Sequence, residues 1–464
     1  MNTPSSLLGV LFDHTIGNIL RMLAVIRLPK LERGRVSRGF VATLIVIMGY
    51  GLVMLFSASY SSGYANYGDV YHFIRPQSII AVAGLGVMWL VSNINYRALR
   101  YMNESFYIIT LVLLVAALFS PVDTNGTYRW VYFAGGAFSL QPSELAKFSV
   151  MLWTADMLDR DNDKKKSLWY GLLKPALPLV PILVLLKMEP HNSAMMLLCL
   201  IFVTMIACNG SAMRWWPLAG AGTVAGAIAY VKHLASGEGY AAGRLGGVWG
   251  LTPTNTTGMQ WQTRQSIYAI CTGGLFGVGI GNSVQKHQWL PYAENDFVFA
   301  VIGEELGFVG AIALIALFAA LVIQGIFIAL RAPDLYGTLL GIGIVSQVAW
   351  QVFLHIGVGT ALLPNTGISL PFFSYGGTSL LLLLGEMGVL LSISRAGNAR
   401  EERMAEQHRA ETDPYAPPHP LPQRYGVRPC CRGRRPRRPV SLPLQGRWSS
   451  ASDDQWGFAL LLLA

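Results

Sequence analysis

Apolar stretches about as long as a bilayer-crossing helix recur along the first 395 residues of this chain. A helix needs roughly 20 mostly apolar residues to span the hydrocarbon core. Charged residues make up only 13% of the 464-residue sequence, which is about half their share in a soluble domain. The pattern predicts an all-α polytopic membrane protein with about ten transmembrane helices, and it excludes an ordinary soluble enzyme. The expected spans lie near residues 39–57, 77–93, 106–121, 142–158, 168–186, 193–208, 216–234, 297–330, 336–362 and 375–395.

Basic residues predict the orientation of these spans. Lys and Arg in short loops favour the cytoplasm, and here they cluster before the first span and after the second, fourth, sixth, eighth and tenth. Both termini are therefore expected in the cytoplasm of a multi-pass plasma-membrane protein. The 297–330 stretch is long for one span, so counts of nine and eleven stay open. The loops expected outside the cell are 58–76, 122–141, 187–192, 235–296 and 363–374.

The two ends of the chain differ from its centre. Residues 1–38 form a basic segment without a signal-peptide cleavage pattern, and residues 39–395 form the membrane domain, in which 235–296 is a large outer loop. The Pro- and Arg-rich residues 396–464 are expected to be a disordered cytoplasmic tail. A solvated linker is favoured for it over contact with anionic lipid or nucleic acid, so no nucleic-acid partner is expected. Five scattered cysteines are too few for a disulfide framework or a zinc site.

Three polar segments at the expected outer ends of spans are candidates for chemistry, because charges there are costly to bury. The first runs from Arg129 to Lys147, where Pro142 suits a first helical turn and places Glu144 and Lys147 on one face. A simple anchoring ion pair is the alternative for these two residues. The second segment, 281–297, contains Asp296, which could instead be a helix N-cap.

The third segment, 365–379, has a glycine-rich turn that could expose backbone N–H groups to phosphate, although glycine also serves close helix contact. Three carboxylates, Glu304, Glu305 and Glu386, fall within spans beside glycines. Interhelical hydrogen bonds are favoured over a proton path for them. His191 follows Glu189 and Pro190 in a short loop and is expected to be an ordinary polar loop residue.

Long strings of this sequence closely resemble the SEDS family, whose members act in bacterial shape, elongation, division and sporulation. They are QPSELAKFSV at 141–150, GLFGVGIGNSVQKHQWLPYAENDFVFAVIGEELGFVG at 275–310 and NTGISLPFFSYGGTSLLLLLGEMGVLLSISR at 365–395. MLFSASY at 54–60 and the region from Arg75 to Gln77 resemble the family's opening, so the resemblance covers residues 40–395. The sequences of the segments GNSVQK, ENDF and IGEELG favour the division branch of the family.

The resemblance implies a ten-helix membrane protein with cytoplasmic termini that polymerises lipid II into β-1,4 glycan at the outer leaflet. It also implies a class B penicillin-binding protein as transpeptidase partner, within an elongation or division complex. The family's essential aspartate maps onto Asp296, and its Glu and Lys of the fourth helix map onto Glu144 and Lys147. EPHNSA at 189–194 departs from the pattern, because many relatives carry aspartate in place of His191 and a Gly-Thr pair nearby.

Simple chemistry makes sense of that mapping. The donor is an α-linked lipid diphosphate and the product is a β-linked glycan, so the anomeric centre inverts and one displacement suffices. A diphosphate leaves without being protonated, so the reaction does not need the general acid that an inverting glycosidase uses. One base, assigned to Asp296, then suffices with cationic stabilisation from protein side chains or from a divalent cation such as Mg or Mn. The expected substrate-binding residues are Arg129, Glu144, Lys147, Asn282, Ser283, Lys286, Ser374, Gly376 and Gly377.

Two other functions compete with polymerisation. A lipid II flippase or transporter would place essential charges near the bilayer midplane, at broken helices or repeats. A non-catalytic division scaffold would tolerate the loss of Asp296. The densest polar groups lie instead at the expected outer rim, which favours the glycosyltransferase.

Overall fold

The structure is a computed structural model that describes residues 34–120, 129–133, 138–211 and 259–412. Its helices coincide with nine of the ten expected spans, and the tenth, near 216–234, lies outside the described residues. Seven described helices are long and apolar enough to cross a membrane, so the polytopic all-α class is confirmed. The helices are α2 (Arg38–Tyr67), α3 (Ile74–Ser92), α4 (Leu99–Leu118), α5 (Pro142–Arg160), α6 (Lys174–Ala176), α7 (Leu179–Met188), α8 (Asn192–Cys208), α11 (Met259–Gly273), α12 (Val298–Leu330), α13 (Leu335–Gly359) and α14 (Gly377–Thr412).

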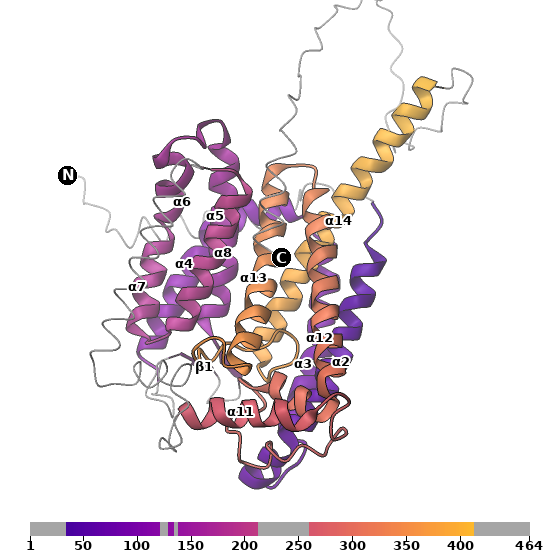
Figure 1. Ribbon diagram of the computed structural model, residues 1–464. Coiled ribbons are helices and arrows are strands. Elements are labelled where there is room, and N and C mark those ends of the chain that lie inside the picture. The colour runs from indigo at the N-terminus through magenta and orange to yellow at the C-terminus, as the bar shows by residue number, and fades with distance from the viewer. Residues whose placement is uncertain (1–33, 121–128, 134–137, 212–258, 413–464) are drawn as a thin grey trace, which may run out of the picture.

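The long helices form a bundle around α13, most of whose side chains are buried. Helix α13 contacts α12, α8 and α5, while α14 packs along α3 and α2 packs along α12. Figure 1 shows that α11 lies crosswise at one end of this bundle, and that α14 projects beyond the opposite end. The backbone N–H of Ser37, just before α2, donates to Ser394 Oγ of α14 at 3.2 Å. The segment before α2 and the late part of α14 therefore share one end.

Local sequence explains where two of the helices begin. Pro142 occupies the first turn of α5, where its missing N–H costs nothing. Asp334 caps α13 by accepting a hydrogen bond from Gly337 N at 2.8 Å. The same carboxylate accepts hydrogen bonds from Tyr96 Oη at 2.9 Å and Arg97 Nε at 2.6 Å, in the 3-10 turn before α4. One residue thereby joins the start of α13 to the start of α4.

Three details of the chain path differ from expectation. Helix α14 continues to Thr412, so the tail expected to be disordered from 396 is helical at first, because this stretch is rich in Ala, Glu and Arg, which are good helix formers. The expected outer loop 235–296 contains helix α11. A short antiparallel hairpin of β1 (Val131–Phe133) and β2 (Phe138–Leu140) precedes α5. Each strand of this hairpin is too short to show the alternation of apolar and polar residues by which a strand is recognised in a sequence.

Helix α12 covers the whole long stretch but is interrupted at Gly307, whose φ is 65°. The break leaves backbone N–H and carbonyl groups of α12 without partners in the helix, and the loop after α11 forms hydrogen bonds with them. Phe308 N and Val309 N donate to the carbonyls of Gly274 and Leu275, at 2.9 and 3.1 Å. The carbonyls of Glu304 and Glu305 accept from residues 278 and 279, each at 3.0 Å. This double connection fixes the segment that leads into the loop before α12.

Candidate active site

A polar cavity of about 620 Å³ is lined in part by the start of α11, the helix that crosses one end of the bundle. It brings together the segment before β1, the starts of α5, α8 and α11, and the loops before α12 and α14. Five of the ten residues expected at the site line it, and they come from segments far apart in the sequence. These five are Arg129, Glu144, Lys147, Asp296 and Gly376.

Lys147 and Glu144 form an ion pair in the cavity wall. Their Nζ and Oε2 atoms are 2.8 Å apart, and only 2% of the lysine side chain is exposed. The i,i+3 spacing on α5 places them together, as the sequence predicted. Ser379 Oγ of α14 donates to the same Glu144 oxygen at 3.1 Å. The pair is therefore an anchor between helices that also faces the cavity, so both interpretations of it stay open.

The short loop after α7 completes this basic wall. Arg129 Nη2 donates to the carbonyl oxygen of Pro190 at 3.3 Å, and the neighbouring His191 lines the cavity with only 7% of its surface exposed. Burial, reinforced by the charges of Arg129 and Lys147, lowers the pKa of His191 to about 3. The imidazole is therefore neutral near pH 7. Glu189 is fully buried, and burial raises the pKa of its carboxyl to about 8, against the opposing effect of Arg129.

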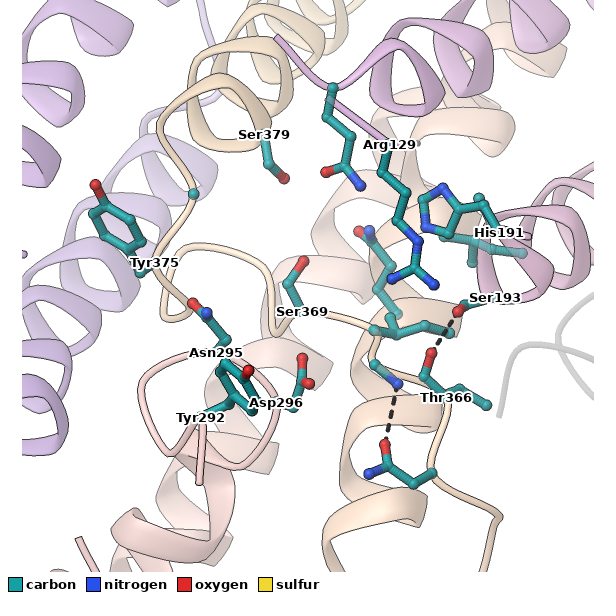
Figure 2. A pocket seen from close by; sticks show the side chains of 18 of the residues that line it. Arg129, His191, Ser193, Tyr292, Asn295, Asp296, Thr366, Ser369, Tyr375 and Ser379 are labelled. Atoms are coloured by element: carbon teal, nitrogen blue, oxygen red, sulfur yellow. Dashed lines mark hydrogen bonds between the residues drawn. The ribbon is translucent and has the colours of Figure 1, made fainter. Parts of the chain in front are cut away.

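His191 was not among the residues expected at the site. The only signal in the sequence was its departure from the family pattern, and that departure did not indicate a role. Figure 2 shows Arg129, His191 and Ser193 on one side of the cavity, with Tyr292, Asn295 and Asp296 on another.

Asp296 stands at the end of the loop before α12. Its backbone N–H donates to the carbonyl of Tyr292 at 3.0 Å, which closes a turn. The N-cap of α12 is Phe297, so the structure does not support the alternative that Asp296 is the N-cap. The facing loop approaches the carboxylate closely, because a Cβ atom on Gly367 would lie 3.7 Å from Asp296 Oδ2. Gly367 also has a φ of 66°, which disfavours any larger residue.

The glycine-rich turn supports the Asp296 loop, and Tyr375, Gly376 and Ser379 beside it also line the cavity. Ser374 Oγ donates to the carbonyl of Asn295 at 2.6 Å and accepts from Leu370 N at 2.8 Å. Gly376 N donates to Gln77 Oε1 at 3.3 Å. Neither Ser374 nor Gly377 lines the cavity. The Gly376 N–H is engaged by a protein acceptor, whereas Gly376 and Ser379 line the cavity, so phosphate binding by this helix start stays a prediction.

The structure places Asn282, Ser283 and Lys286 away from the cavity. Lys286 is fully buried, with its Nζ 2.5 Å from Glu305 Oε1 and 3.2 Å from Ser57 Oγ of α2. The Ser283 hydroxyl donates to the carboxylate of Glu304. The amide of Asn282 donates to the carbonyl of Val278 at 3.2 Å. Two buried carboxylates of α12 therefore hold Ser283 and Lys286, and a backbone carbonyl holds Asn282, although the sequence alone assigned all three to substrate.

The expected interhelical hydrogen bonds are present for Glu305, which accepts one from Ser57 Oγ of α2 at 2.6 Å, and for Glu386, whereas Glu304 bonds to a loop. Glu304 and Glu305 hold the loop just described, and Glu386 of α14 accepts a hydrogen bond from Gln347 Nε2 of α13 at 2.8 Å. Among the cavity residues that carry aromatic or amide groups, Trp261, Gln262 and Gln351 lie outside the three polar segments that the sequence singled out. Six others lie within those segments but were not assigned to substrate: Trp130, Gln141, Tyr292, Asn295, Asn365 and Tyr375.

Bundle and cavity together define a multi-pass membrane protein with a charged polar site at one end. A family model described as cell cycle protein, of FtsW, RodA and SpoVE, matches residues 38–399. The chain belongs to this family, which is the SEDS family that its sequence resembles.

Curated relatives agree with this assignment. The chain is 35% identical to stage V sporulation protein E of Bacillus subtilis over 359 residues, which cover 76% of this chain and 96% of the relative. It is 34% identical to the probable peptidoglycan glycosyltransferase FtsW of Trichlorobacter lovleyi over 376 residues, which cover 80% of this chain and 96% of the relative.

Solved structures share the fold. One, from work on structural coordination of polymerization and crosslinking by a peptidoglycan synthase complex, aligns with a TM-score of 0.64 and 26% identity over 78% of this chain and 98% of that one. The rod shape determining protein RodA of Thermus thermophilus aligns with a TM-score of 0.56 and 26% identity, over 78% and 97%.

Proposed function

We propose that this protein is a peptidoglycan glycosyltransferase that polymerises lipid II at the outer leaflet, with Asp296 as the base. The FtsW relatives support the activity, because they carry this name at about a third identity over most of the chain. The observation that carries the site assignment is that one cavity contains Asp296 together with the cations Arg129 and Lys147. A base and a diphosphate-binding wall are the two parts that an inverting displacement from a lipid diphosphate requires.

In the proposed reaction, Asp296 accepts the proton of the acceptor sugar hydroxyl. The hydroxyl oxygen forms a bond to the anomeric carbon of the donor as the bond from that carbon to the diphosphate oxygen breaks. The electron pair leaves with undecaprenyl diphosphate, whose negative charge Arg129 and Lys147 stabilise. Because the leaving group needs no proton, a single carboxylate suffices as the proton acceptor.

A divalent cation such as Mg or Mn fits this cavity only in part. Within the described residues, no group of three His, Cys, Asp or Glu side chains is placed to hold a metal ion. Mg²⁺ is commonly held by one or two carboxylates together with substrate phosphates. Glu144, beside Lys147 on the basic wall, is the lining carboxylate that would hold such an ion, which would supply further charge stabilisation to the leaving diphosphate.

We further propose that the cavity faces outside and that the protein works beside a class B penicillin-binding protein in division. The outside assignment rests on the basic residues of the opposite loops. The partner is suggested by the structural neighbour, which comes from work on polymerization and crosslinking by a peptidoglycan synthase complex. The FtsW relatives favour division over elongation.

The deciding test is glycan synthesis from lipid II by the purified full-length protein in detergent, alone and with a class B penicillin-binding protein. We expect labelled lipid II to be converted into polymer that a muramidase digests. No polymer under either condition, from a protein that stays folded, would contradict the proposal. Movement of lipid II across vesicles without polymerisation would identify a transporter instead.

A further inference from the structure

The cavity is chemically divided. One wall carries the nitrogen-containing side chains of Arg129, Lys147 and His191. The other wall, built by α11 and the loop before α12, carries Trp261 and Tyr292. Asp296 belongs to the second wall by its position in the chain and faces the loop around Gly367. A diphosphate is drawn to the first wall by charge. The second wall offers no cation among these residues, so it suits a different part of the substrate.

Trp261 is held in a fixed orientation. Its indole Nε1 donates to the carbonyl oxygen of Trp289 at 2.9 Å, and the two indole rings lie with centroids 6.2 Å apart. The only polar atom of the Trp261 side chain is therefore already bonded to the protein. What the partly exposed ring presents to the cavity is its apolar surface.

A line of amide groups connects this tryptophan to the base. Gln262 Oε1 accepts a hydrogen bond from Asn365 Nδ2 at 2.9 Å, and Asn365 Oδ1 accepts one from Gly367 N at 3.2 Å. Gly367 in turn lies against the carboxylate of Asp296. Since the Gln262 oxygen is engaged, its amide nitrogen is the part that remains to donate to a ligand. Within the described residues it has no protein acceptor.

We propose that Trp261, Gln262 and Asn365 form the subsite for the acceptor saccharide, the sugar whose hydroxyl Asp296 deprotonates. This inference rests on the proposed function. A pyranose ring has a face of C–H groups that packs on an aromatic ring and a rim of hydroxyl and acetamido groups that matches amide side chains. The subsite adjoins Asp296, so a sugar held there brings a hydroxyl to the base. The donor then lies with its diphosphate at Arg129 and Lys147.

The test uses a lipid-free probe, the disaccharide of N-acetylglucosamine and N-acetylmuramic acid, so that the diphosphate cannot contribute to binding. Binding to purified full-length protein is measured by saturation-transfer NMR. We expect Trp261→Ala to weaken disaccharide binding roughly fivefold to tenfold, and Trp261→Phe to retain most of it. Gln262→Met, which keeps side-chain volume but removes the amide, should also weaken binding. In polymerisation assays the same variants should raise the KM for lipid II more than they lower kcat.

Two controls separate the subsite from folding and from the proposed function. Trp169→Ala changes a half-exposed tryptophan that does not line the cavity and should leave binding unchanged. Asp296→Asn, whose amide can still hydrogen-bond the acceptor hydroxyl, should retain disaccharide binding while losing most of its glycan synthesis. Unchanged disaccharide binding by folded Trp261→Ala and Gln262→Met would overturn the subsite. Disaccharide binding that depends on Trp261, in a protein that makes no glycan, would keep the subsite and reject the polymerase.

Discussion

The hydroxyl of Ser374 donates a 2.6 Å hydrogen bond to the carbonyl oxygen of Asn295, the residue that precedes Asp296. Next to it, Tyr375 N donates to the carbonyl of Glu294 at 3.0 Å. The turn before α14 is thus bonded to the backbone of the loop that carries the proposed base. Ser374 does not line the cavity, so we expect it to act by positioning Asp296 and not by touching substrate.

Ser374→Ala should therefore reduce glycan synthesis by about 10-fold or more, because displacing a reacting group by about 1 Å can cost about 100-fold. Stability should fall by only about 1 kcal/mol, the usual worth of one hydrogen bond. Initial polymerisation rates and thermal midpoints in detergent measure both effects. Ser346→Ala is the matched control, since that buried serine bonds only within α13. Equal rates for the two variants would remove the positioning role.

Glu144 and Lys147 can be separated into structural and chemical roles by a double-mutant cycle. Breaking a buried ion pair from one side costs about 3 to 5 kcal/mol, because the remaining charge stays desolvated. Lys147→Met and Glu144→Gln should each lower the thermal midpoint, and the double variant should recover much of it. Glycan synthesis should stay low in the double variant, since the cation for the diphosphate is gone. Recovery of both stability and synthesis would exclude the pair from the chemistry.

The ion pair of Lys286 and Glu305 should affect stability but not the chemistry, because neither residue lines the cavity. Lys286→Met should destabilise the protein by about 3 to 5 kcal/mol. Adding Glu305→Gln should restore both the thermal midpoint and polymerisation. Loss of synthesis that persists in a stable double variant would show that Lys286 acts on substrate after all.

The contrast between these two lysines explains what the sequence could and could not predict. Spans, fold class and the approach of Glu144 to Lys147 follow from hydropathy and helical spacing, which are local. Whether a lysine faces substrate or a buried carboxylate depends on packing between segments far apart. Lys286 meets Ser57 of α2 across 229 positions of sequence, and no local pattern carries that information. The wall of Trp261 and Gln262 was missed for the same reason, since the loop from Asn365 to Gly367 places it beside Asp296.

The loop after α7 should make stability depend on pH in two windows. Burial raises the pKa of Glu189 from 4.5 to about 8, so its proton is held more tightly in the folded protein. The stability that this raised pKa contributes to the folded protein is present at low pH and is lost as pH rises towards about 8. His191, whose pKa is lowered from 6.5 to about 3, acts oppositely, and its contribution is lost as pH falls below 6.5.

Thermal midpoints measured in detergent across this pH range test the assignment. Glu189→Gln should flatten the decline on the alkaline side, because the amide cannot ionise. His191→Asn should likewise flatten the decline on the acidic side. A wild-type decline towards pH 8 that survives in Glu189→Gln would show that another group titrates.

The most direct test of the account is lipid II polymerisation by purified Asp296→Asn. The amide keeps the shape of the side chain but cannot accept the proton of the acceptor hydroxyl. We predict wild-type thermal stability with glycan synthesis lowered by about 10² to 10⁴, the usual effect of losing a general base. Polymerisation at the wild-type rate by a folded Asp296→Asn protein would contradict the proposed reaction.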